Sequence, residues 1–320
     1  MAEAARAGFP LKAFPLSPEV SAAGEFPFEP GAIVLWDSLF LERLATRPPP
    51  ACGAVHGLLV HYLPFLDPGL EAAARRAWEE RFDRAAQRLG FLIATGRGAA
   101  RRLQRRYPNL PVLLCEPGVD PVFAAAAGTG PEPPGGRPVR LATVANLLPA
   151  KGQLELLEIL ADLEHLPWEW HLAGDERRDP AYAAAFGKRA VDLGLAERIV
   201  RHGVLDRPEL ARWLARMDLF AFPSRYESYG MALAEARAAG LPSVATAVGE
   251  AERLVRHGVT GFAVPAGDRR AFRTALARLV DDEPLRRGFR ENLGREPPRS
   301  WEATFRDFAA ALRTLGPFQG

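Results

Sequence analysis

Two carboxylates stand near each other in the segment PSRYESYGMALAEARAAGLP, residues 223–242. Glu227 and Glu235 are eight positions apart, with Gly230 between them. A pair of acids can act as the acid and base of a hydrolase, but such a pair lies about 5 to 9.5 Å apart and flanks one bond. At the helical rise of about 1.5 Å per residue, these two acids are separated by up to about 12 Å. That length favours the binding of two separate groups, such as the sugar and the ribose of a nucleotide sugar.

The turn between the two acids is suited to binding an anion. It follows the apolar run DLFAFP, which is typical of a buried strand, and leads into a helix expected over residues 230–239. Backbone N–H groups are free at a helix start and the helix dipole is positive there, so phosphate binds readily. The groups expected to bind it are the backbone N–H groups of Ser228, Tyr229, Gly230 and Met231.

Lys151 supplies a cation in a comparable position. In ATVANLLPAKGQLELL a strand ends, a loop follows, and the lysine precedes Gly152 at the start of a helix. Lysine is rare in this arginine-rich chain and occurs only at Lys12, Lys151 and Lys188. The helix dipole makes a first-turn lysine slightly unfavourable, which favours contact with a diphosphate over a solvated side chain.

The composition sets limits on the class of protein. With 320 residues, 48% of them hydrophobic, the chain is long enough for two domains of ordinary size. A formal net charge of +2 favours neither nucleic acid nor a membrane as the main partner. Cys52 and Cys115 lie in apolar runs without metal-ligand spacing, which indicates buried free thiols in a reducing cytosol. Because the sequence has no long apolar stretch and no signal-peptide core, we expect a cytoplasmic protein with at most peripheral membrane contact.

Short apolar runs alternate with longer helical segments, which is the pattern of βα units around parallel sheets. Strands are expected at 32–36, 54–61, 90–95, 112–116, 139–144, 168–173, 218–223, 242–246 and 261–265. Helices are expected at 71–89, 97–106, 152–165, 207–216, 230–239 and 268–281. The Ala-, Gly- and Pro-rich stretch at 126–138 predicts a linker between an N-terminal domain at 1–125 and a C-terminal domain at 139–299.

A ligand of such domains is expected at the carboxyl ends of the parallel strands, where loops converge. The residues at or just after the ends of predicted strands include Asp37, His61, Thr95, Asn146, Gly174 and Ser224. An isolated histidine more often has a structural role, but the position of His61 at a strand end favours a role in the site.

The segment from Leu141 to Asp268 resembles the nucleotide-binding domain of retaining glycosyltransferases with the GT-B fold, of the family 4-like group. The matching motifs are VANLLPAKG (144–152), WHLAGD (170–175), RHGVLD (201–206), PSRYESYGMALAEARAAGLP (223–242) and GVTGFAVPAGD (258–268). The E-x7-E pair is a weak signal alone, but it is specific within this context. LLVHYLP (58–64), CEPGVDPVF (115–123) and the closing segment at 300–315 extend the resemblance over nearly the whole chain. It implies two Rossmann-like domains, with the closing helix returning to the N-terminal one.

The resemblance implies a role for each candidate residue. Glu227 would bind hydroxyls of the transferred sugar or lie near its developing positive charge, and Glu235 would bind the ribose. Lys151 and the helix-start N–H groups would stabilise the leaving diphosphate in place of a metal. His61 would face the sugar from the N-terminal domain. Gly174 and Asn146 would line the donor site, although the family often has an arginine where this chain has Asn146, and no cofactor is implied.

A departure from the family at the N-terminus leaves the function open. The chain begins with MAEAARAGFPLK where the family has a first strand and a Gly-rich loop, so we expect the first βα unit to be absent. The favoured function is hexosyl transfer from a UDP-sugar, or from GDP-mannose, to an unidentified small metabolite, lipid or polysaccharide precursor. The alternatives are a catalytically silent nucleotide-sugar-binding protein and a GT-B epimerase or phosphorylase.

A basic helix face in the N-terminal domain has two interpretations. It consists of Arg97, Arg101, Arg102, Arg105 and Arg106. Such a face is typical of a solvated helix in an arginine-rich chain. The alternative is contact with anionic lipid or with a phosphorylated acceptor.

Overall fold

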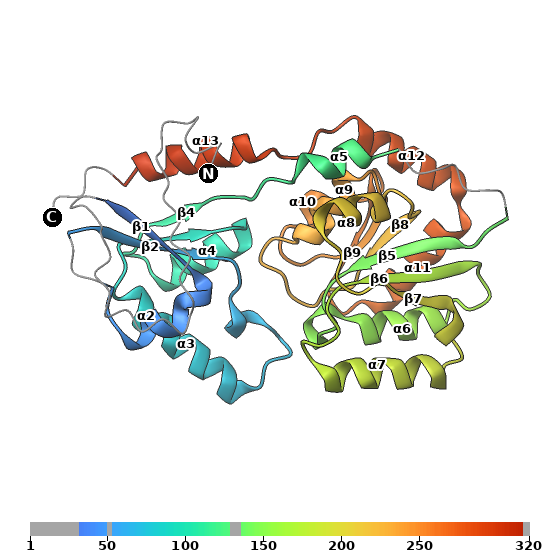
Figure 1. Ribbon diagram of the computed structural model, residues 1–320, viewed down its shortest axis with the longest axis horizontal. Coiled ribbons are helices and arrows are strands. Elements are labelled where there is room, and N and C mark those ends of the chain that lie inside the picture. The colour runs from blue at the N-terminus through green and yellow to red at the C-terminus, as the bar shows by residue number, and fades with distance from the viewer. Residues whose placement is uncertain (1–31, 50–52, 129–135, 316–320) are drawn as a thin grey trace. The chain divides into compact units, whose positions relative to one another are not determined.

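The chain divides into two units, each with its own parallel sheet (Figure 1). Unit 1 contains the residues up to Gly118 together with those from Trp301 onward, and unit 2 contains Val119–Ser300. The computed structural model describes residues 32–49, 53–128 and 136–315. The predicted absence of a first βα unit and the predicted burial of Cys52 fall outside these residues. Cys115 is half-buried, and its thiol lies 3.9 Å from the carbonyl oxygen of Thr304.

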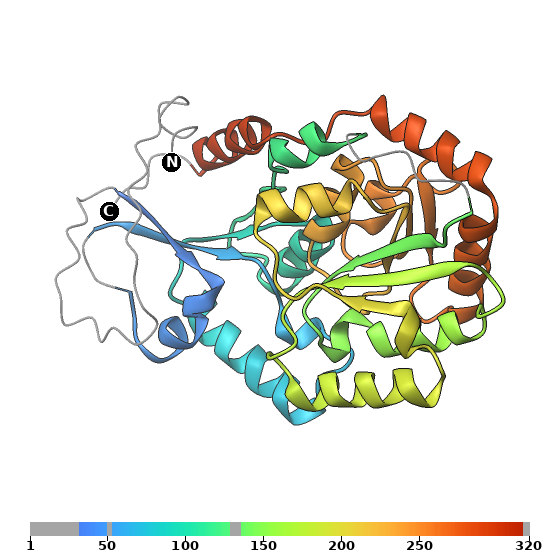
Figure 2. The ribbon, with the colours of Figure 1, turned by 45° about the vertical axis from the view of Figure 1, so that its right-hand side comes forward.

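Unit 1 is built on a four-stranded sheet with the order β1-β2-β3-β4. The strands are β1 (Ile33–Asp37), β2 (Val55–Val60), β3 (Phe91–Ala94) and β4 (Val112–Leu114). The helices are η1 (Ser38–Phe40), α2 (Leu41–Thr46), η2 (Pro64–Leu66), α3 (Ala72–Ala86), α4 (Arg97–Arg106) and α13 (Trp301–Arg313). Leu312 of α13 packs on Phe91 and Ile93, so the closing helix covers one face of this sheet, and α2, α3 and α4 cover the other (Figures 1 and 2).

Unit 2 is built on a six-stranded parallel sheet with the order β10-β9-β8-β5-β6-β7. The strands are β5 (Val139–Val144), β6 (Trp168–Ala173), β7 (Ile199–Arg201), β8 (Leu219–Phe222), β9 (Ser243–Thr246) and β10 (Gly261–Val264). The helices are α5 (Pro121–Ala126), η3 (Pro149–Lys151), α6 (Gln153–Ala161), α7 (Pro180–Asp192), η4 (Ala196–Arg198), α8 (Arg207–Leu214), α9 (Met231–Ala238), α10 (Ala251–Leu254), α11 (Arg269–Asp281) and α12 (Glu283–Gly294).

Helices cover both faces of this second sheet, and each face has its own apolar core. Leu141, Trp170 and Phe186 belong to the core beneath α6, α7 and α11, whereas Phe220 and Leu233 belong to the core beneath α5, α8 and α9. This division follows from right-handed crossover connections, because the strand order advances in one direction from β5 to β7 and in the other from β8 to β10.

The centre of the sheet in unit 2 is a topological switch point. β5 pairs with β6 on one side and with β8 on the other, and the chain leaves the two central strands in opposite directions. In open parallel sheets, ligands bind outside the carboxyl ends of the strands at such a switch point. The loops that follow β5 and β8 carry Lys151 and Glu227.

Several elements differ from the sequence prediction. β7 was not expected, because it has three residues and two of them are exposed. α7 and α12 were also not among the expected helices. Each buries two side chains, Phe186 and Ala190 in α7 and Phe289 and Leu293 in α12.

The boundary between the units lies before the predicted linker at 126–138. The segment directly after Gly118 forms α5, whose Phe123 is fully buried in the core with α8 and α9. The buried ring of Phe123 therefore fixes the start of unit 2, and the Ala-rich sequence around it did not indicate this. Residues 129–135 of the predicted linker lie outside the described residues.

We expect Gly152→Ala to destabilise the protein more than a matched glycine substitution does. Gly152 has φ 68°, and a Cβ there would lie 2.2 Å from the carbonyl oxygen of Pro223, in the loop after β8. Gly258 has φ 74° with no atom near the added Cβ, so Gly258→Ala tests the backbone conformation alone. Each substitution should lower the free energy of unfolding by about 1–2 kcal/mol, because alanine is strained in the left-handed region. Gly152→Ala should lower it by about 1–3 kcal/mol more because of the clash. Equal losses in urea denaturation would show that the two loops do not depend on this contact.

Candidate functional site

Lys151 and Glu227 form an ion pair across the switch point of unit 2. Lys151 ends the short helix η3 after β5, and Glu227 lies in the loop between β8 and α9. The Lys151 Nζ lies 2.6 Å from the Glu227 Oε1, which also accepts a hydrogen bond of 3.0 Å from the Ser224 hydroxyl. The two side chains are 24% and 16% exposed, so solvent screens their attraction only in part. The structure thus brings together two charged residues that the sequence placed in separate motifs.

Backbone contacts hold the two loops at a fixed separation. The Arg225 N–H donates to the carbonyl oxygen of Ala150 at 2.8 Å, directly beside Lys151. The Thr246 hydroxyl, from β9, donates to the carbonyl oxygens of Phe222 and Ser224 on the other side of the loop after β8. The geometry of the ion pair is therefore set by the backbone and not by the long side chains alone.

Glu227 lies before the helix and Glu235 within it, as the sequence predicted. Gly230 adopts φ 106° as the N-cap, and α9 begins at Met231. The helical rise applies only to the last part of the distance between the two acids, and the 12 Å estimate does not describe their separation. Ser228 and Tyr229 are buried, and no side-chain cap is present at this helix start within the described residues.

Glu235 is a half-buried acid in α9 without a close partner. Within the described residues its carboxylate makes no hydrogen bond or ion pair. Burial raises the pKa of Glu235 to about 7, Arg207 opposes this increase, and the negative charge of Asp120 adds to it. An acid that burial holds partly neutral without a protein partner is suited to bind a polar ligand group.

Asn146 and Gly174 brace the loops beside the ion pair. The Asn146 Oδ1 accepts the Asp175 N–H at 3.0 Å, and its carbonyl oxygen accepts the amide of buried Gln153 at 2.8 Å. The Gly174 N–H donates to the carbonyl oxygen of Gly203 at 2.8 Å. These bonds give both residues a structural role at the carboxyl ends of β5 and β6, and their contact with a donor stays a prediction.

His61 lies at the carboxyl end of β2 in unit 1, as the sequence indicated. Its Nε2 lies 3.0 Å from the Oδ2 of Asp37, which ends the neighbouring strand β1. The side chains are 51% and 36% exposed, so this pair faces solvent. Thr95, at the end of β3, is buried, and its hydroxyl donates to the carbonyl oxygen of Val60 at 3.4 Å.

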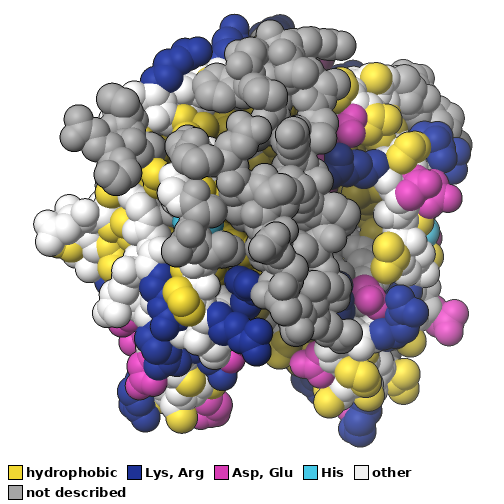
Figure 3. Space-filling model, turned by 60° about the vertical axis from the view of Figure 1, so that its left-hand side comes forward, with side chains coloured by type: hydrophobic (Ala, Val, Ile, Leu, Met, Phe, Trp, Pro, Cys, Tyr) yellow, Lys and Arg dark blue, Asp and Glu magenta, His cyan; other side chains and the backbone are white. Residues whose placement is uncertain are grey.

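The basic face of α4 is divided between paired and solvated residues. Arg97 lies 3.1 Å from Glu116, and Arg106 lies 2.8 Å from Asp83, whereas Arg101, Arg102 and Arg105 are exposed. On the surface shown in Figure 3, Lys and Arg side chains lie beside Asp and Glu side chains. Mixed charges of this kind are typical of a solvated surface, and contact of the three exposed arginines with lipid or acceptor stays a prediction.

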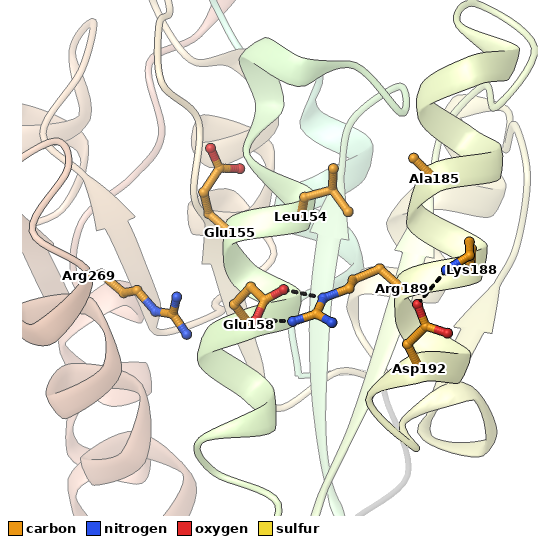
Figure 4. Close-up of a pocket in the computed structure, with 8 residues that line it drawn as sticks. All are labelled: Leu154, Glu155, Glu158, Ala185, Lys188, Arg189, Asp192 and Arg269. Carbon is orange, nitrogen blue, oxygen red and sulfur yellow. Dashed lines mark hydrogen bonds and ion pairs between the residues drawn. The ribbon is translucent and has the colours of Figure 1, made fainter.

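A groove of about 440 Å³ lies among the helices of unit 2 rather than at the strand ends (Figure 4). It is lined by Leu154, Glu155, Glu158, Ala185, Lys188, Arg189, Asp192 and Arg269. Glu158 makes two contacts with Arg189, of 2.5 and 3.0 Å, and Lys188 contacts Asp192 at 2.8 Å. Most of the charged side chains that line this groove therefore pair with one another.

Within the described residues, no group of three or more His, Cys, Asp or Glu side chains is arranged to hold a metal ion. In the same residues, no helix has the length and apolar character that a membrane span requires.

Residues 138–282, most of unit 2, match the family model described as Glycosyl transferases group 1. Unit 2 is a group 1 glycosyltransferase domain. The match includes both loops at the switch point, the helix α9 and the residues from Lys151 to Glu235.

Curated relatives of this group 1 domain are glycosyltransferases by name. D-inositol 3-phosphate glycosyltransferase 1 of Catenulispora acidiphila is 30% identical over 217 residues, which are 66% of this chain and 51% of the relative. The lipopolysaccharide core biosynthesis mannosyltransferase LpsB of Rhizobium meliloti is 37% identical over 106 residues, 32% of this chain and 30% of the relative. The chain spans about half or less of the length of the first relatives it matches.

Solved structures extend the comparison to both units. Sucrose-phosphate synthase from Thermosynechococcus elongatus has a TM-score of 0.71 and 20% identity, over 88% of this chain and 73% of that one. Anabaena HepE in complex with UDP and glucose has a TM-score of 0.65 and 18% identity, over 82% of this chain and 72% of that one. The predicted GT-B fold and the resemblance to GT-B glycosyltransferases are confirmed.

No role was predicted for two residues of the loop that carries Glu227. Ser224 follows a predicted strand, and its hydroxyl donates to the Glu227 carboxylate. The Tyr226 hydroxyl lies 3.4 Å from that of Ser228. The position of both in the same short loop as Glu227 is the signal that could have identified them.

The stability of the group 1 domain is expected to depend on pH through Glu235. The pKa of about 7 in the folded chain lies above the ordinary value of 4.5, so the folded chain binds this proton more tightly than the unfolded chain does. Stability from this proton is fully present below pH 4.5 and is lost as the pH rises through 7. Glu235→Gln should therefore stabilise the protein by up to about 3 kcal/mol at pH 8 and much less at pH 5. Urea denaturation at the two pH values measures the difference, and an equal effect at both would contradict the burial of an unpaired acid.

Proposed function

We propose that the protein transfers a hexosyl group from a nucleotide sugar to an acceptor hydroxyl, with retention of the anomeric configuration and without a metal. The observation that carries this proposal is the ion pair between Lys151 and Glu227 across the switch point of a group 1 glycosyltransferase domain. The chain spans only part of its relatives, so the activity of the whole protein is inferred from this site.

The contact between the two side chains supports adjoining sites for phosphate and sugar. A cation at the leaving phosphate and a carboxylate at the sugar must lie on either side of the bond that breaks, which joins the anomeric carbon to the phosphate oxygen. In that arrangement Lys151 stabilises the negative charge that grows on the diphosphate, together with the N–H groups at the start of α9. Glu227 binds sugar hydroxyls and lies near the positive charge that develops on the ring.

Transfer with retention then needs no protein nucleophile. The acceptor hydroxyl attacks the anomeric carbon from the face that the diphosphate leaves, and a leaving phosphate oxygen takes the hydroxyl proton. The glycosidic bond forms as the bond to phosphate breaks, so charge and protons balance between donor and acceptor. His61 faces the sugar in this proposal, and Glu235 binds the ribose hydroxyls.

A UDP-sugar is the favoured donor, and GDP-mannose is the alternative. The solved structure of Anabaena HepE contains UDP and glucose, which supports the first, and a relative named mannosyltransferase supports the second. The acceptor is a small metabolite, a lipid or a polysaccharide precursor. Relatives named for D-inositol 3-phosphate favour a small phosphorylated polyol as the first acceptor to test.

Glu227→Gln is expected to abolish transfer while leaving nucleotide binding nearly intact. The substitution keeps the shape of the side chain and removes the charge, so kcat should fall by about 100-fold or more, equivalent to about 2.7 kcal/mol. The Kd for UDP should stay within about threefold, because the carboxylate acts on the sugar. Transfer or donor hydrolysis is measured over a panel of UDP-, GDP- and ADP-sugars.

Glu155→Gln is the matched control for this experiment. Glu155 is an exposed acid in the first turn of α6. It lies 3.6 Å from Arg225, and Arg225 belongs to the same loop as Glu227. Its loss should leave kcat within about twofold, since it makes no contact with the ion pair. If the wild-type protein binds a nucleotide sugar but neither transfers nor hydrolyses it, the transferase proposal fails and a silent binding protein is favoured.

Binding of UDP should weaken as the pH falls below the pKa of Glu235. The ionised carboxylate accepts hydrogen bonds from both ribose hydroxyls, and a protonated one offers less acceptor capacity. With a pKa of about 7 in the free protein, the ionised fraction falls about tenfold between pH 8 and pH 6. Calorimetry should therefore show up to about tenfold weaker UDP binding at pH 6.

Glu235→Gln isolates the part of this change that comes from Glu235. The phosphates of UDP also take up protons as the pH falls, and that effect persists in the variant. The wild-type protein should lose more affinity than the variant between pH 8 and pH 6. Parallel pH profiles for the two proteins would rule out Glu235 as the ribose ligand.

A further inference from the structure

Asp37 holds His61 in place at the carboxyl edge of the sheet in unit 1. The two residues end neighbouring parallel strands, β1 and β2, and the Asp37 Oδ2 lies 3.0 Å from the His61 Nε2. The other carboxylate oxygen accepts the Leu39 N–H at 2.9 Å and so caps η1. The backbone N–H of His61 donates to the Ser38 hydroxyl at 3.3 Å. Both the ring and the backbone of His61 are thus tied to the end of β1.

The chemistry of this pair decides which ring nitrogen carries the hydrogen. An ionised carboxylate only accepts hydrogen bonds, so the Nε2 of a neutral His61 must donate to Asp37. The hydrogen of the neutral ring is then on Nε2, and Nδ1 has a free lone pair. Because Asp37 is itself fixed by the Leu39 N–H, the carboxylate cannot turn to accommodate the other tautomer without breaking the cap.

The solvent exposure of the pair argues against a role in folding. The side chain of His61 is 51% exposed and that of Asp37 is 36% exposed. Polar pairs at such positions contribute little to stability because water competes for both partners. What the pair does fix is the orientation and the tautomer of a ring that is accessible to a ligand.

We propose that Asp37 is a positioning residue that holds His61 in the Nε2–H tautomer, so that Nδ1 accepts a hydrogen bond from a hydroxyl of the transferred sugar. This inference rests on the proposed function, which gives His61 its place at the sugar. Asp37 itself touches no substrate and acts through the imidazole ring. A histidine with its hydrogen on Nδ1 would donate to this hydroxyl instead of accepting from it, so the direction of the hydrogen bond would be reversed.

The experiment combines a spectroscopic and a kinetic measurement on the full chain. Long-range ¹H–¹⁵N spectra at pH 8, where imidazole rings are mostly neutral, report the tautomer of each of the six histidines. The His61 signals are those missing from His61→Gln. In Asp37→Asn the amide oxygen can keep the bond to the Leu39 N–H, which turns the amide N–H₂ toward the ring and favours the opposite tautomer.

Asp67→Asn is the matched control. Asp67 also lies in unit 1 and also uses both carboxylate oxygens, accepting the Tyr62 hydroxyl at 2.9 Å and the Gly69 N–H at 2.8 Å. It makes no contact with the His61 ring. A thermal melt of each variant checks that the fold is kept. If Asp37→Asn acts through His61, it should have no further effect on kcat in a His61→Gln background.

The proposal predicts the Nε2–H tautomer in the wild type and a shift toward Nδ1–H in Asp37→Asn. The same variant should lose kcat on the order of tenfold with an unchanged melting temperature and an unchanged Kd for UDP, whereas Asp67→Asn should match the wild type. An Nδ1–H tautomer in the wild type, or a loss of kcat that persists in the His61→Gln background, would overturn it. If the wild type transfers no sugar, the proposed function fails, while the spectra still decide whether Asp37 sets the tautomer.

Discussion

The ion pair between Lys151 and Glu227 is the contact at the centre of the candidate site in unit 2. Two opposite charges at a partly buried position attract strongly, but they must also be removed from water, so the pair is useful only if its geometry is well fixed. The backbone provides that geometry through the Arg225 N–H on Ala150 and the Thr246 hydroxyl on the loop after β8. Gly152 allows the two loops to approach where a Cβ would meet Pro223. Preorganised charges of this kind need little rearrangement when a substrate becomes charged.

Glu235 lies in the same domain but, unlike Lys151 and Glu227, has no ion-pair partner within the described residues. Its carboxylate lies in α9 among small side chains, and Arg207, the nearest cation that lowers its pKa, is engaged at 3.4 Å with Asp120. The acid therefore destabilises the folded domain at neutral pH, where a glutamine would not. Residues that reduce stability without a structural benefit are found at binding sites, because the ligand supplies the missing partner. Lys151 and Glu227 pair with each other, whereas the Glu235 carboxylate makes no hydrogen bond or ion pair within the described residues.

The sequence was sufficient for the sheets and for the ends of most strands, because mainly apolar runs such as VRLATV and LFAF are largely buried, as central strands of a parallel sheet are. It could not reveal the contact between Lys151 and Glu227, since the two are 76 residues apart and their separation depends on how two loops bend. The bracing role of Asn146 was equally hidden, because an amide that accepts a backbone N–H has no periodicity to detect. β7 and α7 were missed because few of their side chains are buried.

Each unit contains an acid–base pair, and the two pairs differ in their exposure to solvent. Each places an acid against a base at the carboxyl ends of neighbouring parallel strands, Glu227 with Lys151 in unit 2 and Asp37 with His61 in unit 1. The pair in unit 2 is the more buried, so its electrostatic effect exists before any ligand arrives. The pair in unit 1 faces water, which weakens its charge but leaves its direction intact. Exclusion of water from this second pair would strengthen it, and the orientation set by Asp37 would then matter more than its charge.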